Sequence, residues 1–239
     1  MLKFNINSIF FINSASYLLL FLSILISYIP DQEHKENGND DIKEIFVGFK
    51  ENFTNIKLRI SLLFTIVVNI AMLGFNATII FYLQDQLKLS NSLVGIVYSI
   101  AGFGSLIAVT FLSTFLNKKD AFILMNISMA TIPLVIMASG IVENWIFFGI
   151  CYSILSGLIT IASVSITTIQ QQESTVYNIG KILSSSFVIA TIFAPFGGIL
   201  AAYFNWLLNP RLSLVILGLL SSLLVILIKS YEKKLRGDK

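Results

Sequence analysis

Seven long apolar stretches limit what this chain can fold into. An α-helix rises about 1.5 Å per residue, so about twenty apolar residues cross the ~30 Å of hydrocarbon in a bilayer. The stretches cover residues 6–29, 59–83, 92–116, 121–140, 145–167, 182–204 and 212–229. Charged residues make up 12% of the chain, against roughly a quarter in soluble domains, and the mean hydropathy is +0.84. The sequence therefore predicts an all-α polytopic membrane protein with seven transmembrane helices.

The stretches divide the chain into three parts. Residues 1–29 are predicted to form one transmembrane helix, residues 30–57 a loop, and residues 58–239 a six-helix bundle. The loop opens with "PDQEHKENGNDD", which is polar and has no apolar period, so it predicts a linker. The following "IKEIFVGFKENF" predicts an amphipathic helix that either lies at the inner membrane interface or packs against the protein's own cytoplasmic face. Its apolar positions have helical spacing: Ile42, Ile45, Phe46, Phe49 and Phe53.

The positions of the basic residues predict the orientation in the membrane. Cytoplasmic segments of membrane proteins are enriched in Lys and Arg. With the C-terminus inside, thirteen of the 16 Lys and Arg residues lie on the cytoplasmic side, and the outer segments hold Lys3, Lys88 and Arg211. We therefore expect a multi-pass protein of the cell membrane with its N-terminus outside, its C-terminus in the cytoplasm and residues 30–57 cytoplasmic. A net charge of +3 distributed in this way does not indicate nucleic-acid binding.

Residues that carry catalytic or metal chemistry are scarce. The single cysteine, Cys151, lies in an apolar stretch, and the single histidine, His34, lies in the polar loop. The sequence thus predicts neither a disulfide framework nor a metal site, cofactor or Ser-His-Asp triad, and we expect no enzyme activity. Asp, Glu, Lys and Arg are absent from the deep parts of the six later stretches, which argues against a proton pump or a voltage sensor.

One short phrase occurs twice. "AGFGSLIAVTF" (101–111) and "APFGGILAAYF" (194–204) are identical at five of eleven positions and lie in the second and fifth of the six later helices. An odd number of crossings separates these two helices, so they run in opposite directions. The repeat therefore predicts two three-helix units of inverted topology, an arrangement that recurs in secondary transporters with the substrate path between the repeats.

Small residues in these phrases predict close helix packing or gating. Without a Cβ or with a small side chain, residues at such positions let helix backbones approach one another in membranes. Pro195 lacks an N–H and crowds the carbonyl one turn earlier, so it is expected to bend or loosen its helix. The candidate packing residues are Gly102, Gly104, Pro195, Gly197 and Gly198.

Uncharged polar residues form two helical stripes. One follows the fourth of the six helices through Ser153, Ser156, Thr160, Ser163, Thr167 and Gln170, and the other follows the first through Thr65, Asn69 and Asn76. Polar groups in hydrocarbon need partners, so both stripes should face protein or water. They predict either a wet cavity that contacts substrate or hydrogen bonds between helices. The candidate cavity residues are Asn69, Asn76, Tyr152, Ser156, Thr160 and Ser163.

Three segments carry a resemblance to a known family. "FNINSIFFINSASYLLLFLSILI", "FVGFKENFTNIKLRISLLF" and "TTIQQQESTVYNIGKILSSSF" resemble the sixth helix, the loop between the halves and the segment after the tenth helix of major facilitator superfamily transporters. The similarity is greatest to drug exporters of the macrolide-efflux type. It marks Gln171, Gly180 and Lys181 as loop residues of interest. Lys118 and Lys119, in "LNKKD", keep the charge of a further family loop but lack its glycine and arginines.

The resemblance implies a function and a partner. It implies secondary active export of lipophilic, drug-like molecules such as macrolides by alternating access, and hence antibiotic resistance. The family has twelve helices, so this chain would correspond to the sixth helix and the C-terminal half. A truncated reading frame, a degenerate gene product and one half of a split transporter with a separate N-terminal half all fit. A membrane protein that does not transport, such as an assembly partner, is the alternative.

Single cysteines, in a background without Cys151, test the predicted orientation. An impermeant thiol reagent added to intact cells should label Leu207→Cys, in an outer connection, and should leave Gly38→Cys unlabelled. The reason is that position 38 lies in the segment that the Lys and Arg distribution assigns to the cytoplasm. Labelling of Gly38→Cys from outside would reverse the predicted topology.

Overall fold

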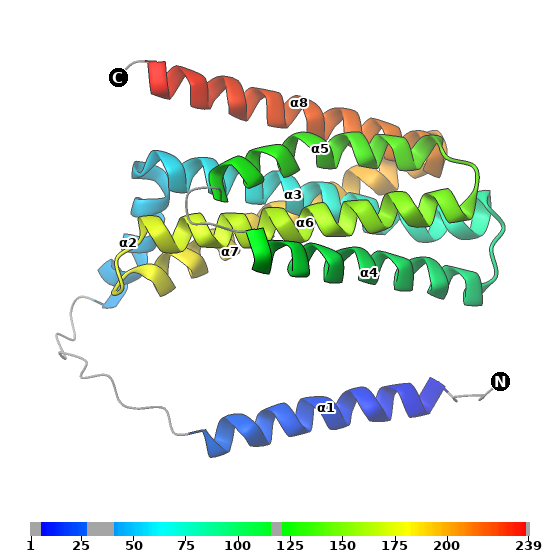
Figure 1. The fold of residues 1–239 in the computed structure, drawn as a ribbon, viewed down its shortest axis with the longest axis horizontal. Helices are drawn as coiled ribbons and strands as arrows, with labels where there is room; N and C mark the ends of the chain where they lie inside the picture. Colours follow the sequence, from blue (N-terminus) through cyan, green and yellow to red (C-terminus); the bar gives the residue numbers. More distant parts are fainter. Residues whose placement is uncertain (1–5, 28–40, 116–120, 238–239) are drawn as a thin grey trace. The chain divides into compact units, whose positions relative to one another are not determined.

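The computed structural model describes residues 6–27, 41–115 and 121–237, which belong to two compact units, residues 1–40 and 41–239. The described part of the first unit is the helix α1 (Ile6–Ile26). In the second unit, a short helix and six long ones are seen (Figure 1): α2 (Asp41–Thr54), α3 (Ile56–Phe81), α4 (Asn91–Phe115), α5 (Ala121–Ile141), α6 (Trp145–Glu173), α7 (Ile179–Leu207) and α8 (Pro210–Gly237). His34, Lys118 and Lys119 lie outside the described residues.

Within the described residues, six helices are long and apolar enough to cross a membrane, and they confirm six of the seven predicted stretches. Most of them run past the apolar stretch that predicted them, for example α6, which continues to Glu173, and α8, which continues to Gly237. The apolar part of α1, Phe10–Ile26, is shorter than these six, so a seventh crossing stays a prediction. Within α1, the hydroxyl groups of Ser16 and Ser23 donate to backbone carbonyls of the same helix, as polar groups in an apolar helix must.

Asparagines and an irregular turn set several helix ends. The Asn55 side chain accepts hydrogen bonds from the N–H groups of Lys57 and Leu58 and so caps α3, and Asn144 caps α6 in the same way. At its far end α3 widens into a π-helical turn, Tyr82–Gln86, which closes with a hydrogen bond from the Leu87 N–H to the Tyr82 carbonyl. The chain then turns at Lys88, whose φ is 54°.

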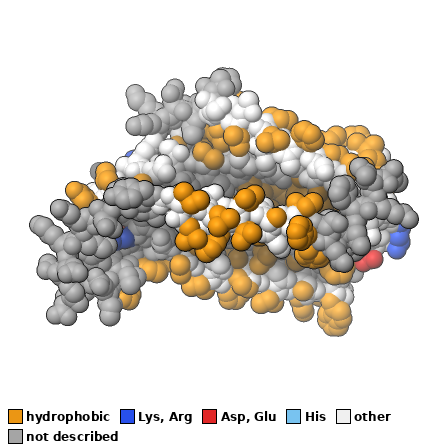
Figure 2. Space-filling model, turned by 90° about the horizontal axis from the view of Figure 1, so that it is seen from below, with side chains coloured by type: hydrophobic (Ala, Val, Ile, Leu, Met, Phe, Trp, Pro, Cys, Tyr) orange, Lys and Arg blue, Asp and Glu red, His pale blue; other side chains and the backbone are white. Residues whose placement is uncertain are grey.

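The long helices form one bundle in which α3 is the most buried. In the most apolar 18-residue segment of α3, 50% is buried inside the protein, whereas in that of α7 the buried share is 17%. Helix α3 packs against α7, α8 and α6, while α4 packs on α6, and α5 packs between α6 and α8. Figure 2 shows hydrophobic side chains along the outside of the helices, and large apolar residues of the bundle such as Phe103, Leu106 and Ile107 of α4 are exposed. Such a surface suits contact with lipid.

Helix α2 packs on the start of α7 through a small and a polar residue. A Cβ added at Gly48 would lie 2.2 Å from the Lys181 carbonyl oxygen, so the two backbones touch. The fully buried Asn52 donates to the Ile182 carbonyl (3.1 Å) and to Ser185 Oγ (2.8 Å), and it accepts from Ser186 Oγ (2.9 Å). Helix α2 therefore packs on the protein itself, which is one of its two predicted placements. The apolar residues Phe46 and Phe53 stay exposed.

Glycines bring helix backbones together in pairs across the bundle. A Cβ at Gly104 of α4 would lie 1.9 Å from the Ser153 carbonyl oxygen of α6. A Cβ at Gly197 of α7 would likewise lie 1.9 Å from the Ile70 carbonyl oxygen of α3. One turn later, each partner helix makes the reverse contact. A Cβ at Gly157 of α6 would lie 3.1 Å from the Gly104 carbonyl oxygen. A Cβ at Gly74 of α3 would lie 3.0 Å from the Gly197 carbonyl oxygen.

The third pair of helices shows the same reciprocity. A Cβ at Gly140 of α5 would lie 2.7 Å from the Arg211 carbonyl oxygen of α8, and one at Gly218 of α8 would lie 2.8 Å from the Pro133 carbonyl oxygen of α5. By contrast, a Cβ at Gly102 would meet no atom within 4 Å, and Gly198 has ordinary contact with Leu73. Pro195 is exposed, and helix α7 continues on both sides of it. Of the five candidate packing residues, Gly104 and Gly197 are therefore the two that make close backbone contacts.

Alanine substitution tests these backbone contacts. Gly104→Ala and Gly197→Ala should each lower the free energy of unfolding by about 1–3 kcal/mol, because the new methyl group forces two helix backbones apart. Thermal unfolding of the purified protein in detergent measures this effect. Gly102→Ala, in the same helix as Gly104, is the matched control and should be neutral or stabilising, since alanine favours the helix. Equal tolerance of Gly104→Ala and Gly102→Ala would contradict the close contact.

Candidate functional site

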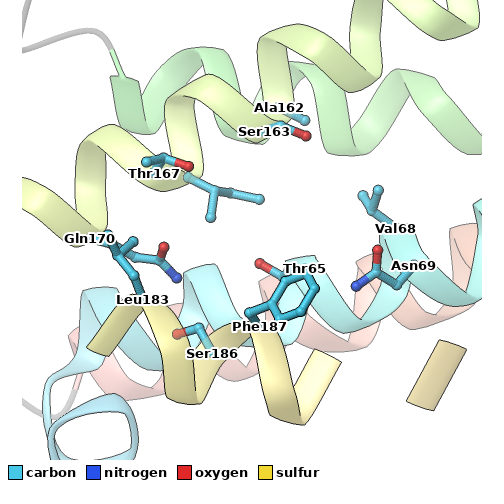
Figure 3. A pocket seen from close by; sticks show the side chains of 11 residues that line it. Thr65, Val68, Asn69, Ala162, Ser163, Thr167, Gln170, Leu183, Ser186 and Phe187 are labelled. Carbon is cyan, nitrogen blue, oxygen red and sulfur yellow. The ribbon is translucent and has the colours of Figure 1, made fainter. Parts of the chain in front are cut away.

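A cavity of about 320 Å³ lies between α3, α6 and α7. Figure 3 shows side chains of α6 pointing across it toward those of α3 and α7. Eleven residues line it: Thr65, Val68, Asn69, Ala162, Ser163, Ile166, Thr167, Gln170, Leu183, Ser186 and Phe187. The Ser186 hydroxyl also donates to Asn52 of α2, so the cavity lies toward the end of the bundle that carries α2.

The lining mixes apolar walls with uncharged polar groups. Polar side chains come from all three helices: Thr65 and Asn69 from α3, Ser163, Thr167 and Gln170 from α6, and Ser186 from α7. The side chains of Asn69, Ser163 and Thr167 have no hydrogen-bond partner within the described part of the chain. They are free to bind water or a solute. The lining contains no charged residue, so the cavity would orient a solute by hydrogen bonds rather than by ion pairs.

The structure brings two of the six candidate cavity residues together, Asn69 and Ser163, with Thr65, Thr167 and Gln170 of the same stripes. Asn76 lies further along α3 and is exposed. Thr160 donates to the Ser156 carbonyl (2.9 Å), which Ser105 of α4 also approaches (3.4 Å). This middle part of the α6 stripe therefore makes hydrogen bonds within and between helices, the other role that the stripe predicted.

Tyr152 belongs to a cluster of aromatic rings elsewhere in the bundle. Its ring centroid lies 5.2 Å from that of Phe75 and 5.6 Å from that of Tyr98. Phe148 stacks on Tyr82 at 5.1 Å and lies 6.4 Å from Phe75. The Tyr82 hydroxyl donates to the Val142 carbonyl, in the connection between α5 and α6, so these rings lie at the end of the bundle opposite α2.

Sequence reasoning missed the contribution of α7 to the cavity. Leu183, Ser186 and Phe187 complete its wall. The run "LSSSF" (183–187), three serines in a row at the start of an apolar helix, is a signal that could have found them. The polar stripes alone point to α3 and α6, because α7 has no polar residues repeated at helical spacing over its length.

The candidate loop residues lie near the α2 end, outside the cavity. Gln171 is exposed at the end of α6, and Gly180 and Lys181 are in the first turn of α7. At the same end, Lys57 of α3 forms a salt bridge with Glu173 of α6 (2.6 Å), to which Asn55 also donates (3.1 Å). Within the described ranges, no group of three or more His, Cys, Asp or Glu residues could hold a metal ion.

The long apolar helices and the uncharged cavity between them define a multi-pass helical membrane protein with a cavity inside its bundle. A sequence model of the Major Facilitator Superfamily matches residues 1–184, and the chain belongs to this family. Its members are transporters rather than enzymes, so this chain is a protein of the transporter class. Searches of curated proteins and of solved structures found no match.

Thiol chemistry tests whether the cavity contains water. In a Cys151→Ser background, Ser163→Cys and Thr167→Cys should react with a small polar methanethiosulfonate on the order of tenfold faster than Ser165→Cys, because the reactive thiolate forms in water. Ser165 is on the same helix and fully buried, which makes it the matched control. Equally slow reaction at all three positions would mean that the cavity is closed to water.

Proposed function

We propose that helices α3–α8 form one half of a major facilitator exporter, which moves neutral lipophilic molecules such as macrolides by secondary active, alternating-access transport. The uncharged, partly polar cavity between α3, α6 and α7 is the observation that carries this proposal. Family membership supplies the transporter class. Residues 58–239 are the transporter bundle in this proposal, and residues 30–57 connect it to α1 on the cytoplasmic side.

The reciprocal glycine contacts support two inverted three-helix units, α3–α5 and α6–α8. Gly104 meets Ser153 in the first helix of the other unit, and Gly197 meets Ile70 in the same way. Gly157 and Gly74 then correspond, one turn further along. The contacts between α5 and α8, the third helices, are reciprocal too. A twofold relation between the units accounts for all three pairs of contacts, and inverted repeats of this kind are typical of transporter halves.

This correspondence relates the cavity to the aromatic cluster. Because Ile70 corresponds to Ser153, the preceding residues Asn69 and Tyr152 correspond, and so do Thr65 and Phe148. Thr65 and Asn69 line a cavity toward the α2 end. Phe148 and Tyr152 are buried among aromatic rings toward the other end. The bundle is therefore open on one side and filled on the other, which suits a half transporter in a state that faces the α2 end.

The cavity chemistry suggests the class of substrate. Val68, Ile166, Leu183 and Phe187 offer apolar contact, and Asn69, Ser163 and Thr167 offer a few hydrogen bonds. Apolar walls give affinity and sparse polar groups give orientation for a bulky, mostly apolar solute. A small anion or a sugar would lose more hydrogen bonds to water than these side chains replace. A neutral, lipophilic substrate with a few polar groups fits best.

The exposed faces support a second half as partner. In the most apolar 18-residue segments of α4 and α7, the buried shares are 28% and 17%. Both shares are smaller than those of the other four spans. The exposed Asn76 lies on the same face of α3 as Asn69 and needs water or protein rather than lipid beside it. We propose that a separate six-helix N-terminal half covers this side and completes the substrate path.

A membrane protein that does not transport is the alternative. The cavity lining lacks an ionisable side chain, and buried ionisable groups are what usually couple transport to protons. In that case the bundle would serve as an assembly partner in the membrane. The transport experiment below separates the two functions.

The experiment is co-expression with a six-helix N-terminal half of a related exporter in a macrolide-sensitive host, followed by measurement of labelled erythromycin accumulation. The pair should lower accumulation. Asn69→Leu, and Asn76→Leu on the same face, should each slow export roughly fivefold, the effect of losing about one hydrogen bond to the substrate. Thr131→Val, at an exposed hydroxyl of α5 outside the cavity, should leave export unchanged.

Each outcome has a defined meaning. Export that survives Asn69→Leu would remove the cavity from the substrate path. Absence of export, with both halves inserted and folded, would favour the alternative function.

A further inference from the structure

A second hollow lies on the outside of the bundle, between α2 and the start of α7. It has a volume of about 320 Å³ and is lined by Phe49, Gly180, Lys181, Ser184, Ser185 and Val188. We call it the α2–α7 groove. Neither the cavity between α3, α6 and α7 nor the proposed transport path uses it. It contains Gly180 and Lys181, two residues that the family resemblance marks without giving them a role.

The groove is formed by two helices that are firmly joined. The backbone contact at Gly48 and the hydrogen bonds of the buried Asn52 hold α2 against the first two turns of α7. Glu51 adds a contact, because its carboxylate accepts a hydrogen bond from Asn178 (2.7 Å). With α2 held in this way, Phe49 forms a fixed wall opposite Ser184 and Val188. The groove is therefore a preformed site.

The groove changes from polar to apolar along α7. Gly180, Ser184 and Val188 follow one another at four-residue intervals, with Lys181 beside the first. Beyond the groove the same row continues with Ile192, which is 62% exposed, and Phe196, which is 55% exposed. A charged group and a hydroxyl at one end and an exposed apolar track at the other match an amphiphile with a polar head and a long apolar chain.

The polar end lies at the level of a membrane surface. Helix α7 has 29 residues and is a candidate membrane span, so it is about 43 Å long and extends beyond the ~30 Å hydrocarbon layer. Its first turns therefore reach the headgroup region. The exposed rings of Phe46 and Phe53 on α2 and of Tyr177 just before α7 suit the same interface.

The two marked residues fit a headgroup in different ways. A Cβ added at Gly180 would meet no atom within 4 Å, so the space beside this residue is open to a ligand. Lys181 contributes a positive charge to the wall. Basic residues between membrane helices at a membrane surface favour acidic lipid headgroups.

We propose that the α2–α7 groove binds an anionic phospholipid from the adjoining membrane leaflet. The phosphate of the headgroup lies against Lys181 and Ser184 in the space beside Gly180. One acyl chain follows Val188, Ile192 and Phe196 along the outside of α7. The ligand is a lipid rather than free phosphate, because the apolar track continues directly from the polar end.

Native mass spectrometry of the purified full chain in detergent, titrated with dioleoylphosphatidylglycerol, tests this site. We expect one tightly bound lipid, with dioleoylphosphatidylcholine binding more weakly. Lys181→Gln should weaken the binding of phosphatidylglycerol about fivefold, the effect of one basic residue at a membrane surface, and Lys181→Arg should retain it. Gly180→Leu should abolish the tight site by filling it without a clash inside the protein.

Two matched controls exclude general effects of charge or size. Lys229→Gln removes a positive charge near the end of α8, and Gly102→Leu adds the same side chain at an open position of α4. Both should bind phosphatidylglycerol as the unchanged protein does, and thermal unfolding should show that all variants are folded. The readout is lipid binding, so it does not depend on whether the protein exports a drug.

Three results would overturn the proposal. The first is unchanged phosphatidylglycerol binding by folded Lys181→Gln and Gly180→Leu proteins. The second is equal affinity for phosphatidylcholine, which would remove the role of the charge. The third is release of the lipid by millimolar inorganic phosphate, which would mean that the groove recognises a free anion.

Discussion

Close contact between helix backbones is the interaction on which the rest of this structure depends. In a bilayer, apolar side chains gain little by leaving lipid for protein, so helices associate through dense packing and hydrogen bonds. Here Gly104, Gly197, Gly140 and Gly218 each place a backbone against a carbonyl of a neighbouring helix. The Gly197 contact sets the spacing between α7 and α3, two of the three helices that line the cavity, and the Gly104 contact holds α4 against α6, the third. A methyl group at Gly197 would have to move α7 or α3, and a wall of the cavity with it.

Much of the fold could be predicted because membrane helices leave a strong signal in a single sequence. Hydrocarbon thickness sets the length of each apolar run, and the six long helices lie where the runs are. The placement of α2 shows where this signal ends. Its apolar stripe suggested the face that packs, but Gly48 and Asn52 make the contact instead. A glycine and one asparagine have no periodicity, and their value comes from the shape and the carbonyl groups of α7.

The candidate site was predictable in part for a related reason. Regular stripes of polar residues identified α3 and α6, and the structure places Asn69 and Ser163 on opposite walls of one cavity. A stripe cannot tell which of its members face an open space and which hydrogen-bond to a neighbouring helix, as Thr160 and Ser156 do. The share of α7 was missed because Leu183, Ser186 and Phe187 enter the wall through the packing of that helix on α3. Which residues form a cavity depends on three helices at once, and no single stretch of sequence records that.

The hydrogen bonds of Asn52 join the segment before α3 to a wall of the cavity. One side chain bonds to the Ile182 carbonyl, to Ser185 and to Ser186, and Ser186 itself lines the cavity. The first two turns of α7 therefore cannot tilt away from α3 unless α2 moves with them or the buried amide loses its partners, which is costly inside a protein. The position of α2 is thus coupled to the position of this wall of the cavity. A movement of α2 would therefore be passed on to Ser186 and to the cavity that it lines.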